Sequence, residues 1–146
     1  MRRTLSVVVL ISTLVMAGAA LAQNPNYDSG PIWRVTYYSI KPGLGDAFWK
    51  DFRENIKPIY EEAKKAGYIT EFKAWVNTGS EHPQDWDVAV AVLYPNWAAL
   101  DQLDNKGASL MVKHYGSREA GLEAVKKRAE MREVIASHLA REVMVK

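Results

Sequence analysis

The sequence predicts an α+β fold, in which four antiparallel strands form one sheet and the helices lie on one face of it. Short segments rich in β-branched and aromatic residues alternate with longer segments whose apolar residues recur every three or four positions. Prolines and glycines stand at the boundaries between these segments. The length of 146 residues suits a single domain with one hydrophobic core.

The N-terminal segment has the features of a secretory signal peptide. Arg2 and Arg3 precede an apolar run over residues 7–17, and residues 20–22 (Ala-Leu-Ala) fit the pattern that signal peptidase accepts. A membrane anchor is the alternative, but the run is shorter than the roughly 20 apolar residues that span a bilayer. We therefore expect residues 1–22 to be removed and the protein to be periplasmic or secreted.

Charge and cysteine content exclude several classes of function. Arg2 and Arg3 account for the formal net charge of +2, so that residues 23–146 carry equal numbers of basic and acidic residues. A balanced chain has no overall attraction to nucleic acid or anionic lipid. Neither nucleic acid nor, after signal cleavage, a membrane is therefore an expected partner. The absence of cysteine excludes disulfides, thiolate metal sites and cysteine nucleophiles.

The predicted domain begins with a strand. Residues 23–31 are rich in Asn, Pro, Ser and Gly, which predicts a flexible N-terminal arm before a single domain over residues 32–146. Residues 32–40 are mainly β-branched and aromatic, and alternate residues point to opposite faces of a strand. We expect the face with Trp33 and Tyr37 to lie beneath the helices, and the face with Arg34 and Tyr38 to meet a partner subunit.

An amphipathic helix is predicted after the Pro-Gly turn at residues 42–43. Asp46 places a carboxylate in the first turn, and Gly67 ends the helix. Pro58 lies inside the pattern and should kink or split the helix, because it cannot donate to the carbonyl of Glu54. The apolar face comprises Phe48, Phe52, Ile56, Ile59, Tyr60 and Ala63.

Two further strands follow. Residues 68–77 alternate between an apolar face and a mixed face, which carries Glu71, Lys73 and Trp75. Residues 86–94 have valine and alanine at both parities, which predicts a central strand buried on both sides.

A helical region and a last strand complete the prediction. Asn96 and Ser117 are good helix N-caps, and Lys106-Gly107 is expected to separate two short helices. The last segment could also serve as a helix end. We expect helices over residues 97–103, over residues 108–115 and from Ser117 onwards, and a strand over residues 137–145.

This order of elements is the ferredoxin-like arrangement, which leaves one face of the sheet without helices. Large side chains such as Trp75 and Tyr38 are assigned to that face. An exposed apolar patch of this kind usually marks an interaction surface. We expect a second subunit to cover it.

Short motifs relate the chain to a known superfamily. They are Lys-Pro-Gly at residues 41–43, Asp-Ala-Phe-Trp at residues 46–49 and the helical proline within residues 57–59. With these motifs, residues 33–100 resemble the dimeric α+β barrel superfamily, most nearly its NIPSNAP-like and antibiotic-biosynthesis-monooxygenase-like members. The resemblance implies a homodimer with facing sheets and a small pocket in each subunit between sheet and helices. The same scaffold hosts monooxygenases, haem enzymes and isomerases, so it names no single activity.

Aromatic and charged side chains supply the candidate site residues. The charged members of the dimer face would pair across the interface, and the alternative is a polar site for an anionic or carbonyl-bearing ligand. The expected ligand-binding residues are Trp33, Tyr37, Trp86, His114 and Tyr115. The expected dimer-face residues are Arg34, Tyr38, Glu71, Lys73 and Trp75.

Each of the three histidines has a separate interpretation. His82 lies in a polar loop and is expected to be solvated, and His138 is expected at a strand edge. His114 is a weak candidate for a catalytic role, because the resemblance to haem-binding relatives implies an axial ligand in this region. Since no histidines stand at metal-ligand spacing, neither a metal nor a cofactor is predicted, with haem on His114 as the alternative.

The leading hypothesis is an exported, homodimeric α+β barrel protein that binds a small molecule between sheet and helices. One alternative is a cofactor-independent monooxygenase acting on a small aromatic substrate, and the other is a haem-binding protein. The sequence contains neither a G-x-S-x-G elbow nor a Gly-rich phosphate loop. Whether the protein catalyses a reaction is therefore left open.

Overall fold

The structure, a computed structural model, describes residues 26–79 and 85–146. The predicted signal peptide, residues 23–25 of the predicted arm and His82 lie outside the described residues. Residues 29–142 form one compact unit, and the two described ends belong to a second one. In that second unit, the Lys146 N–H donates to the Asn26 carbonyl at 3.1 Å and the Lys146 amino group pairs with Asp28 at 2.8 Å.

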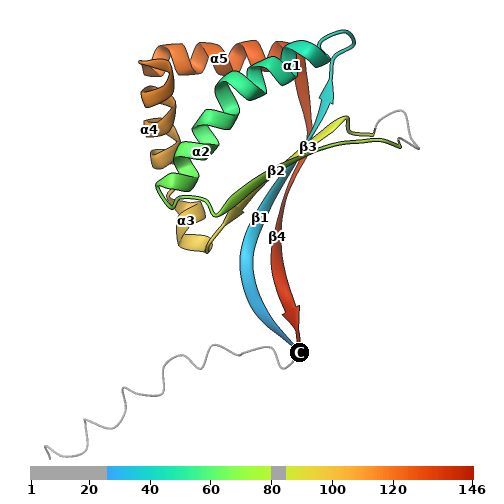
Figure 1. Cartoon of the computed structure of the whole chain (residues 1–146), viewed down its shortest axis with the longest axis vertical. Coiled ribbons are helices and arrows are strands. Elements are labelled where there is room, and N and C mark those ends of the chain that lie inside the picture. The colour runs from blue at the N-terminus through green and yellow to red at the C-terminus, as the bar shows by residue number, and fades with distance from the viewer. Residues whose placement is uncertain (1–25, 80–84) are drawn as a thin grey trace, which may run out of the picture. The chain divides into compact units, whose positions relative to one another are not determined.

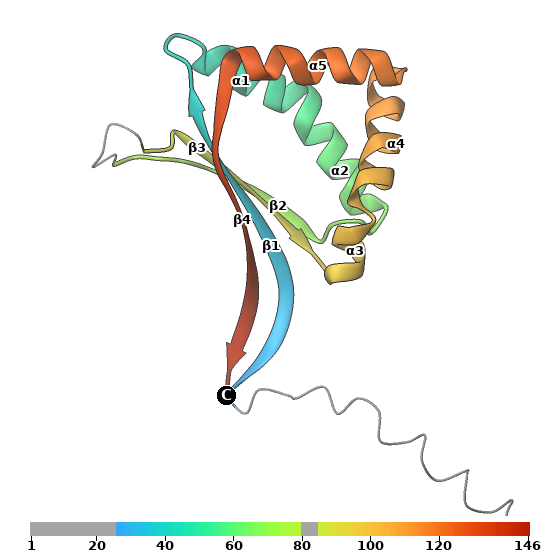
Figure 2. The same ribbon diagram turned by 180° about the vertical axis from the view of Figure 1, so that it is seen from behind.

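The strands form one sheet in the order β2-β3-β1-β4, which is the ferredoxin-like order. The helices lie on one side of this sheet (Figures 1 and 2). The predicted α+β fold class is confirmed. In chain order the elements are β1 (Tyr27–Ile40), α1 (Gly45–Asp51), the π-helix η1 (Phe52–Ile56), α2 (Lys57–Lys65), β2 (Glu71–Val76), β3 (Val88–Tyr94), α3 (Trp97–Asp101), α4 (Leu103–Tyr115), α5 (Arg118–Met131) and β4 (Arg132–Val145).

Strand β3 is one of the two central strands, as the sequence predicts. It pairs antiparallel with β1, where Ile32 lies opposite Tyr94 and Tyr38 opposite Val88, and antiparallel with β2 on its other side. Every residue of β3 is buried. Its valines and alanines therefore serve two covered faces, which explains the lack of polar alternation in the sequence.

Strand β1 begins at Tyr27, so the predicted arm is wrong for its last residues. The pairing of β1 with β3 ends at Ile32, so that Pro31 has β4 as its single neighbouring strand. Proline, which lacks an N–H, is tolerated at a position that is paired on one side only. Gly30 lies close to β4, and a Cβ there would come within 3.0 Å of the Glu142 carbonyl oxygen. The composition predicts an arm here because Gly and Pro are typical of loops. In the structure, both residues lie in β1, where it passes close to β4.

The long helix accommodates Pro58 without a break. The turn before it, η1, is a π-helix in which the Lys57 N–H donates to the Phe52 carbonyl. Pro58 then stands in the first turn of α2, where a missing N–H costs little. The chain therefore stays helical from α1 through α2, and a widened turn, rather than a break, precedes the proline.

The predicted N-caps are confirmed. The Asn96 side chain accepts from the Ala99 N–H at 2.9 Å, and the Ser117 hydroxyl accepts from the Ala120 N–H at 3.1 Å. The predicted break at residues 106–107 is wrong, because α4 runs through it. A single glycine costs a helix only about 1 kcal/mol, and α4 packs against α2 and α5.

Strand β4 begins at Arg132 rather than at residue 137, and α5 ends at Met131. The β-branched Val134 and Ile135 favour a strand, and the open edge of β1 provides the partner. The Lys41 N–H donates to the Met131 carbonyl at 3.0 Å, which begins an antiparallel pairing.

The two faces of β1 are the reverse of the prediction. Tyr38 is 9% exposed and packs with Phe48, Phe52, Val88 and Val90 beneath the helices. The alternation of β1 was recognised correctly, but alternation does not say which face the helices cover. That choice is made by cross-strand and helix partners, and the ring centres of Tyr38 and Phe48 are 6.4 Å apart.

The opposite face of the sheet has no helix and carries aromatic side chains. We call it the helix-free face, and it includes Trp33 and Tyr37 of β1 and Lys73 and Trp75 of β2. The Lys73 amino group lies 5.4 Å from the centre of the Trp33 ring, and the Tyr37 ring contacts the His138 ring at 5.8 Å. Trp75 remains 45% exposed. A large aromatic surface is therefore left in contact with solvent.

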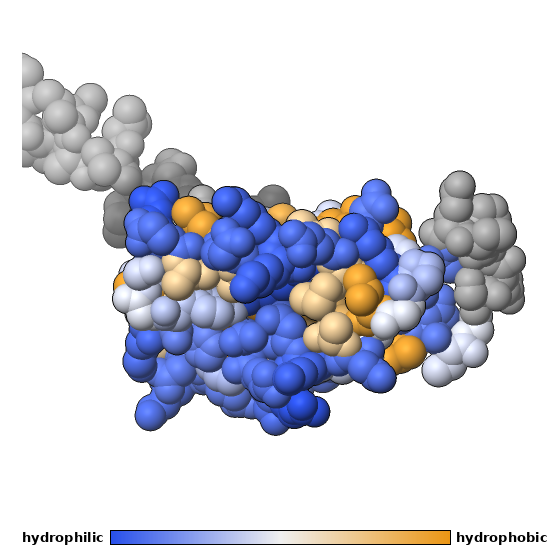
Figure 3. Space-filling view, turned by 90° about the horizontal axis from the view of Figure 1, so that it is seen from above, coloured by the Kyte–Doolittle hydropathy of each residue, from blue (hydrophilic) through white to orange (hydrophobic). Residues whose placement is uncertain are grey.

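The end of the molecule that carries α1 and α5 has a mainly hydrophilic surface with small hydrophobic patches (Figure 3). This is the pattern of helices whose apolar side faces a core. Within residues 26–79 and 85–146, no helix combines the length and the hydropathy needed to cross a bilayer.

Candidate ligand-binding site

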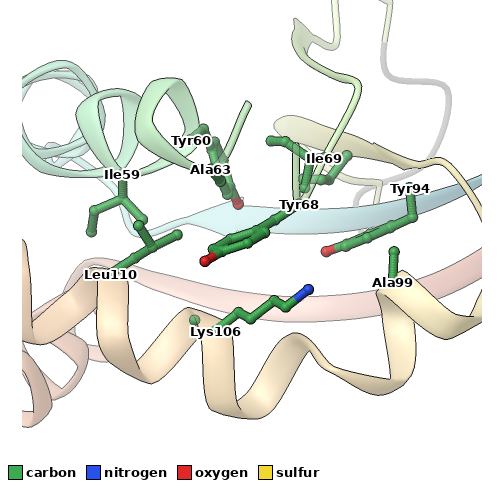
Figure 4. A pocket seen from close by; sticks show the side chains of 11 residues that line it. Ile59, Tyr60, Ala63, Tyr68, Ile69, Tyr94, Ala99, Lys106 and Leu110 are labelled. Atoms are coloured by element: carbon green, nitrogen blue, oxygen red, sulfur yellow. The ribbon is translucent and has the colours of Figure 1, made fainter. Parts of the chain in front are cut away.

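A cavity of about 80 Å³ lies between the helices and the sheet. Residues of α2, β3, α3, α4 and the link before β2 line it, and Figure 4 shows how their side chains converge. The cavity exceeds the roughly 30 Å³ share of one water molecule and is smaller than the ~150 Å³ cavity that accepts benzene. It suits a small group of atoms. Its apolar walls include Ile59, Ala63, Ile69, Val92 and Leu110.

The polar groups of the cavity are three phenols and one ammonium, from Tyr60, Tyr68, Tyr94 and Lys106. In Figure 4 the hydroxyls of Tyr60 and Tyr94 and the amino group of Lys106 point into the cavity. Within the described part of the chain, none of the three hydroxyls has a hydrogen-bonding partner. No buried side-chain polar atom of that part is left unsatisfied, so these hydroxyls keep access to water or to a ligand.

Two phenols of the cavity, those of Tyr60 and Tyr94, are held in their neutral form. Burial raises the pKa of Tyr60 above its ordinary value, and the neighbouring Tyr38 and Tyr94 raise it further against the opposing effect of two arginines. Burial also raises the pKa of Tyr94, and Arg34 opposes it. At neutral pH both groups are therefore hydrogen-bond donors rather than phenolate bases.

Two cations approach the cavity from opposite layers. The Lys106 amino group on α4 lies 4.5 Å from the centre of the Tyr68 ring, a cation–π contact. The Arg34 guanidinium on β1 lies 5.8 Å from the centre of the Tyr94 ring. Among the described residues neither cation has a carboxylate in ion-pair contact. The cavity is therefore apolar in its walls and positive at its edge.

A second polar cluster lies within the helix layer, and we call it the Arg128 network. Arg128 on α5 is 6% exposed; its Nε donates to Asp51 at 2.8 Å and its guanidinium also donates to the Tyr115 hydroxyl. Asn55 donates to the same Asp51 carboxylate at 2.8 Å, and its amide oxygen lies 3.0 Å from the His114 Nε2. Every member has a partner. This cluster ties α1, η1, α4 and α5 together.

The structure does not place the predicted ligand-binding residues around one cavity. Trp33 and Tyr37 lie on the helix-free face, and Trp86 contacts Tyr37 with ring centres 5.5 Å apart. His114 and Tyr115 belong to the Arg128 network, on the helix layer. The reversed faces of β1 explain the first error. His114 lies on the same side of α4 as Lys106 and Leu110 but one turn beyond Leu110, where it meets Asn55, and this explains the second.

The predicted dimer-face residues divide between the two faces of the sheet. Arg34 and Tyr38 lie on the helix-covered face, so the prediction that they belong to the dimer face is wrong. Glu71, Lys73 and Trp75 lie on the helix-free face, where the Glu71 and Lys73 side chains pair at 3.5 Å. Their role in a dimer stays a prediction.

Haem does not fit these residues. His114 is exposed, its Nε2 is engaged by Asn55, and it does not line the cavity. The cavity volume of about 80 Å³ is also far below that of a macrocycle. Among the described residues, no group of three or more metal-binding side chains comes together.

Sequence reasoning missed Lys106 and Tyr68 as site residues. The sequence pattern places Tyr60 on an apolar helix face and Tyr94 at the end of a buried strand, without a role in the site. The alternation of β3 could have identified Tyr94, because every second residue of a strand points to the same face. Tyr94 shares its side of β3 with the core residues Val90 and Val92. The sequence pattern places Lys106 in a break between two helices. A residue in such a break has no defined helix face, so the pattern does not show that Lys106 faces the sheet.

Comparisons with solved structures identify the fold. A dimeric ferredoxin-like protein from an uncultured marine organism matches with a TM-score of 0.53 and 12% identity, over 80% of this chain and 90% of its own. HapK from Hahella chejuensis matches with a TM-score of 0.51 and 12% identity, over 76% and 91%. A NIPSNAP family protein with unknown function from Agrobacterium tumefaciens matches with a TM-score of 0.50 and 13% identity, over 80% and 90%.

This chain has the α+β, ferredoxin-like fold of these solved structures. The resemblance based on the motifs at residues 41–43, 46–49 and 57–59 is confirmed at that level. No family model and no curated protein matches the chain. At such low identity the likeness shows the α+β barrel fold alone.

Proposed function

We propose that this chain is an exported α+β barrel protein that forms a homodimer and binds a small, largely apolar molecule between α2, α4 and the sheet. The observation that supports binding is the cavity itself, whose apolar walls surround hydroxyls of Tyr60, Tyr68 and Tyr94 that have no hydrogen-bond partner among the described residues. Small-molecule sites are typically apolar with a few placed polar groups. In the Arg128 network, by contrast, each residue already has a hydrogen-bond partner within the network.

Filling the cavity tests this proposal. Leu110→Trp places a larger side chain at the cavity wall, and Val112→Trp on the same helix is the control, since Val112 is 41% exposed and does not line the cavity. Binding of small aromatic and branched aliphatic probes is measured by calorimetry or ligand-detected NMR. Overfilling a packed site costs about 1–3 kcal/mol, which corresponds to a loss of affinity of roughly 5- to 150-fold.

The control variant is expected to bind like the wild type, with thermal unfolding of both variants confirming that they are folded. Equal affinity in the wild type and Leu110→Trp would place the ligand elsewhere. No binding to any probe by the wild type would argue against a ligand-binding function.

A homodimer is supported by the helix-free face. Trp33, Tyr37 and Trp75 present aromatic area on a sheet that no helix covers, and such patches are usually interaction surfaces. The similar protein from an uncultured marine organism is described as dimeric. A second copy of the same face would cover this area symmetrically.

The dimer predicts a specific response to a charge on this face. Trp75→Glu would bury a carboxylate against the partner's apolar surface and should shift the protein from dimer to monomer at micromolar concentration. Light scattering measures the mass, and Lys126→Glu on α5, which is exposed, is the control. A wild-type mass equal to one chain would contradict the dimer.

Export is supported by the signal-peptide pattern of residues 1–22. Protein recovered from the periplasm or the medium is expected to begin at Gln23. An intact N-terminus on protein retained in the cytoplasm would contradict export.

A further inference from the structure

The donors around the cavity have no acceptor of their own. Lys106 contributes an ammonium, and the hydroxyls of Tyr68 and Tyr94 contribute hydrogen-bond donors. No carboxylate of a described residue lines the cavity. A group that enters this site therefore meets hydrogen-bond donors and a positive charge, which match an acceptor-rich anion.

Two other cations of the helix layer do have carboxylate partners. Arg128 pairs with Asp51, and Lys113, on the same helix as Lys106, pairs with Glu62. Lys106 instead rests on an aromatic ring, and Arg34 does the same from the sheet side at Tyr94. Lys106 as a residue is also only partly exposed, so a counter-charge brought by a ligand would be screened less than at the open surface.

We propose, on the basis of the ligand-binding function above, that the cavity selects a small monocarboxylate, whose carboxylate lies at Lys106 and accepts from the Tyr94 hydroxyl. Its aromatic or branched aliphatic body enters the apolar part of the cavity beside Leu110 and Ile59. The volume of about 80 Å³ admits only part of a ring, which leaves the charged end at the edge where Lys106 lies. Arg34 adds positive potential behind the Tyr94 ring.

The test compares matched probes on matched variants. Sodium benzoate and sodium isobutyrate are the anionic probes, and benzyl alcohol and isobutanol are their neutral counterparts. Lys106→Met removes the charge and keeps the apolar stem, Lys106→Arg keeps the charge, and Lys113→Met makes the same substitution on α4 outside the cavity.

We expect the wild type to bind each carboxylate more tightly than its alcohol. Hydrogen bonds to charged groups contribute about 1.5–3 kcal/mol, so Lys106→Met should lose about 10- to 100-fold for the carboxylates and less than about twofold for the alcohols. Lys106→Arg should retain most of the affinity, and Lys113→Met should behave like the wild type.

Two results would overturn this inference, and they differ in what they say about the site. If the alcohols bind as tightly as the carboxylates and Lys106→Met changes neither, the selectivity is wrong and the ligand-binding function stands. If neither probe class binds the folded wild type, the ligand-binding function fails as well.

Discussion

The helix layer contains two polar regions that differ in one respect. In the Arg128 network every residue has a hydrogen-bond partner, and Arg128 itself is 6% exposed. In the cavity, within the part of the chain that the structure describes, the hydroxyls of Tyr60, Tyr68 and Tyr94 have no hydrogen-bond partner and Lys106 has no ion pair. A buried polar group contributes to stability when it is satisfied within the chain. Polar groups that the chain leaves unpartnered are available to something else.

The largest expected effect is on the Arg128 network. Arg128→Met removes the partner of Asp51 and should lower the free energy of unfolding by about 3–5 kcal/mol, because it leaves a charge poorly compensated in the interior. Lys106→Met should change it by no more than about 0.5 kcal/mol. Urea unfolding at a fixed protein concentration measures both. Similar losses in the two variants would break the distinction between a structural and a functional cluster.

A smaller effect is expected at alkaline pH from Tyr60. Burial raises the pKa of its phenol in the folded chain, so above the unfolded value of about 10 the folded state holds a proton that the unfolded state has lost. The stability from this difference is complete below pH 10 and falls as the pH rises further. The free energy of unfolding falls between pH 8 and pH 11 in both proteins, and this fall should be about 1 kcal/mol smaller in Tyr60→Phe than in the wild type.

The matched control is Tyr37→Phe, which removes a hydroxyl from the helix-free face. Unfolding curves at several pH values are compared for the three proteins. An identical alkaline loss in wild type and Tyr60→Phe would show that this phenol is solvated.

The smallest expected effect is at His114. Its contact with Asn55 lies at an exposed position, and a hydrogen bond of this kind contributes about 0.5–1.5 kcal/mol. His114→Ala should therefore lower the free energy of unfolding by at most about 1 kcal/mol and leave ligand affinity unchanged. If a folded His114→Ala variant no longer bound the ligand, the Arg128 network would also contribute to ligand binding. That result would contradict the separation of the network from the cavity.

Local chemistry in the sequence was sufficient to predict the elements and their order. Asn96 and Ser117 cap helices because their side chains are followed by free backbone donors, and the two-sided apolar pattern of β3 reflects burial on both faces. Such features depend on neighbours along the chain. They can be read without knowledge of the tertiary structure.

The candidate site was predicted poorly because it depends on contacts between distant segments. Alternation in β1 shows two faces, but the side that carries Tyr38 is chosen by Phe48 and Phe52 on another element. Lys106 faces Tyr68 only because α4 passes through the glycine at 107 instead of breaking there. Both errors arose where local propensity gave way to packing.

The π turn η1 sets the rotational phase between α1 and α2. Successive residues of an α-helix are about 100° apart around the axis, so one residue fewer between Phe52 and Ile56 would turn Asp51 by about that angle relative to Tyr60. Asp51 would then no longer face Arg128 while Tyr60 faced the cavity. This single widened turn lets one helix serve a satisfied network with one part and an open site with the next.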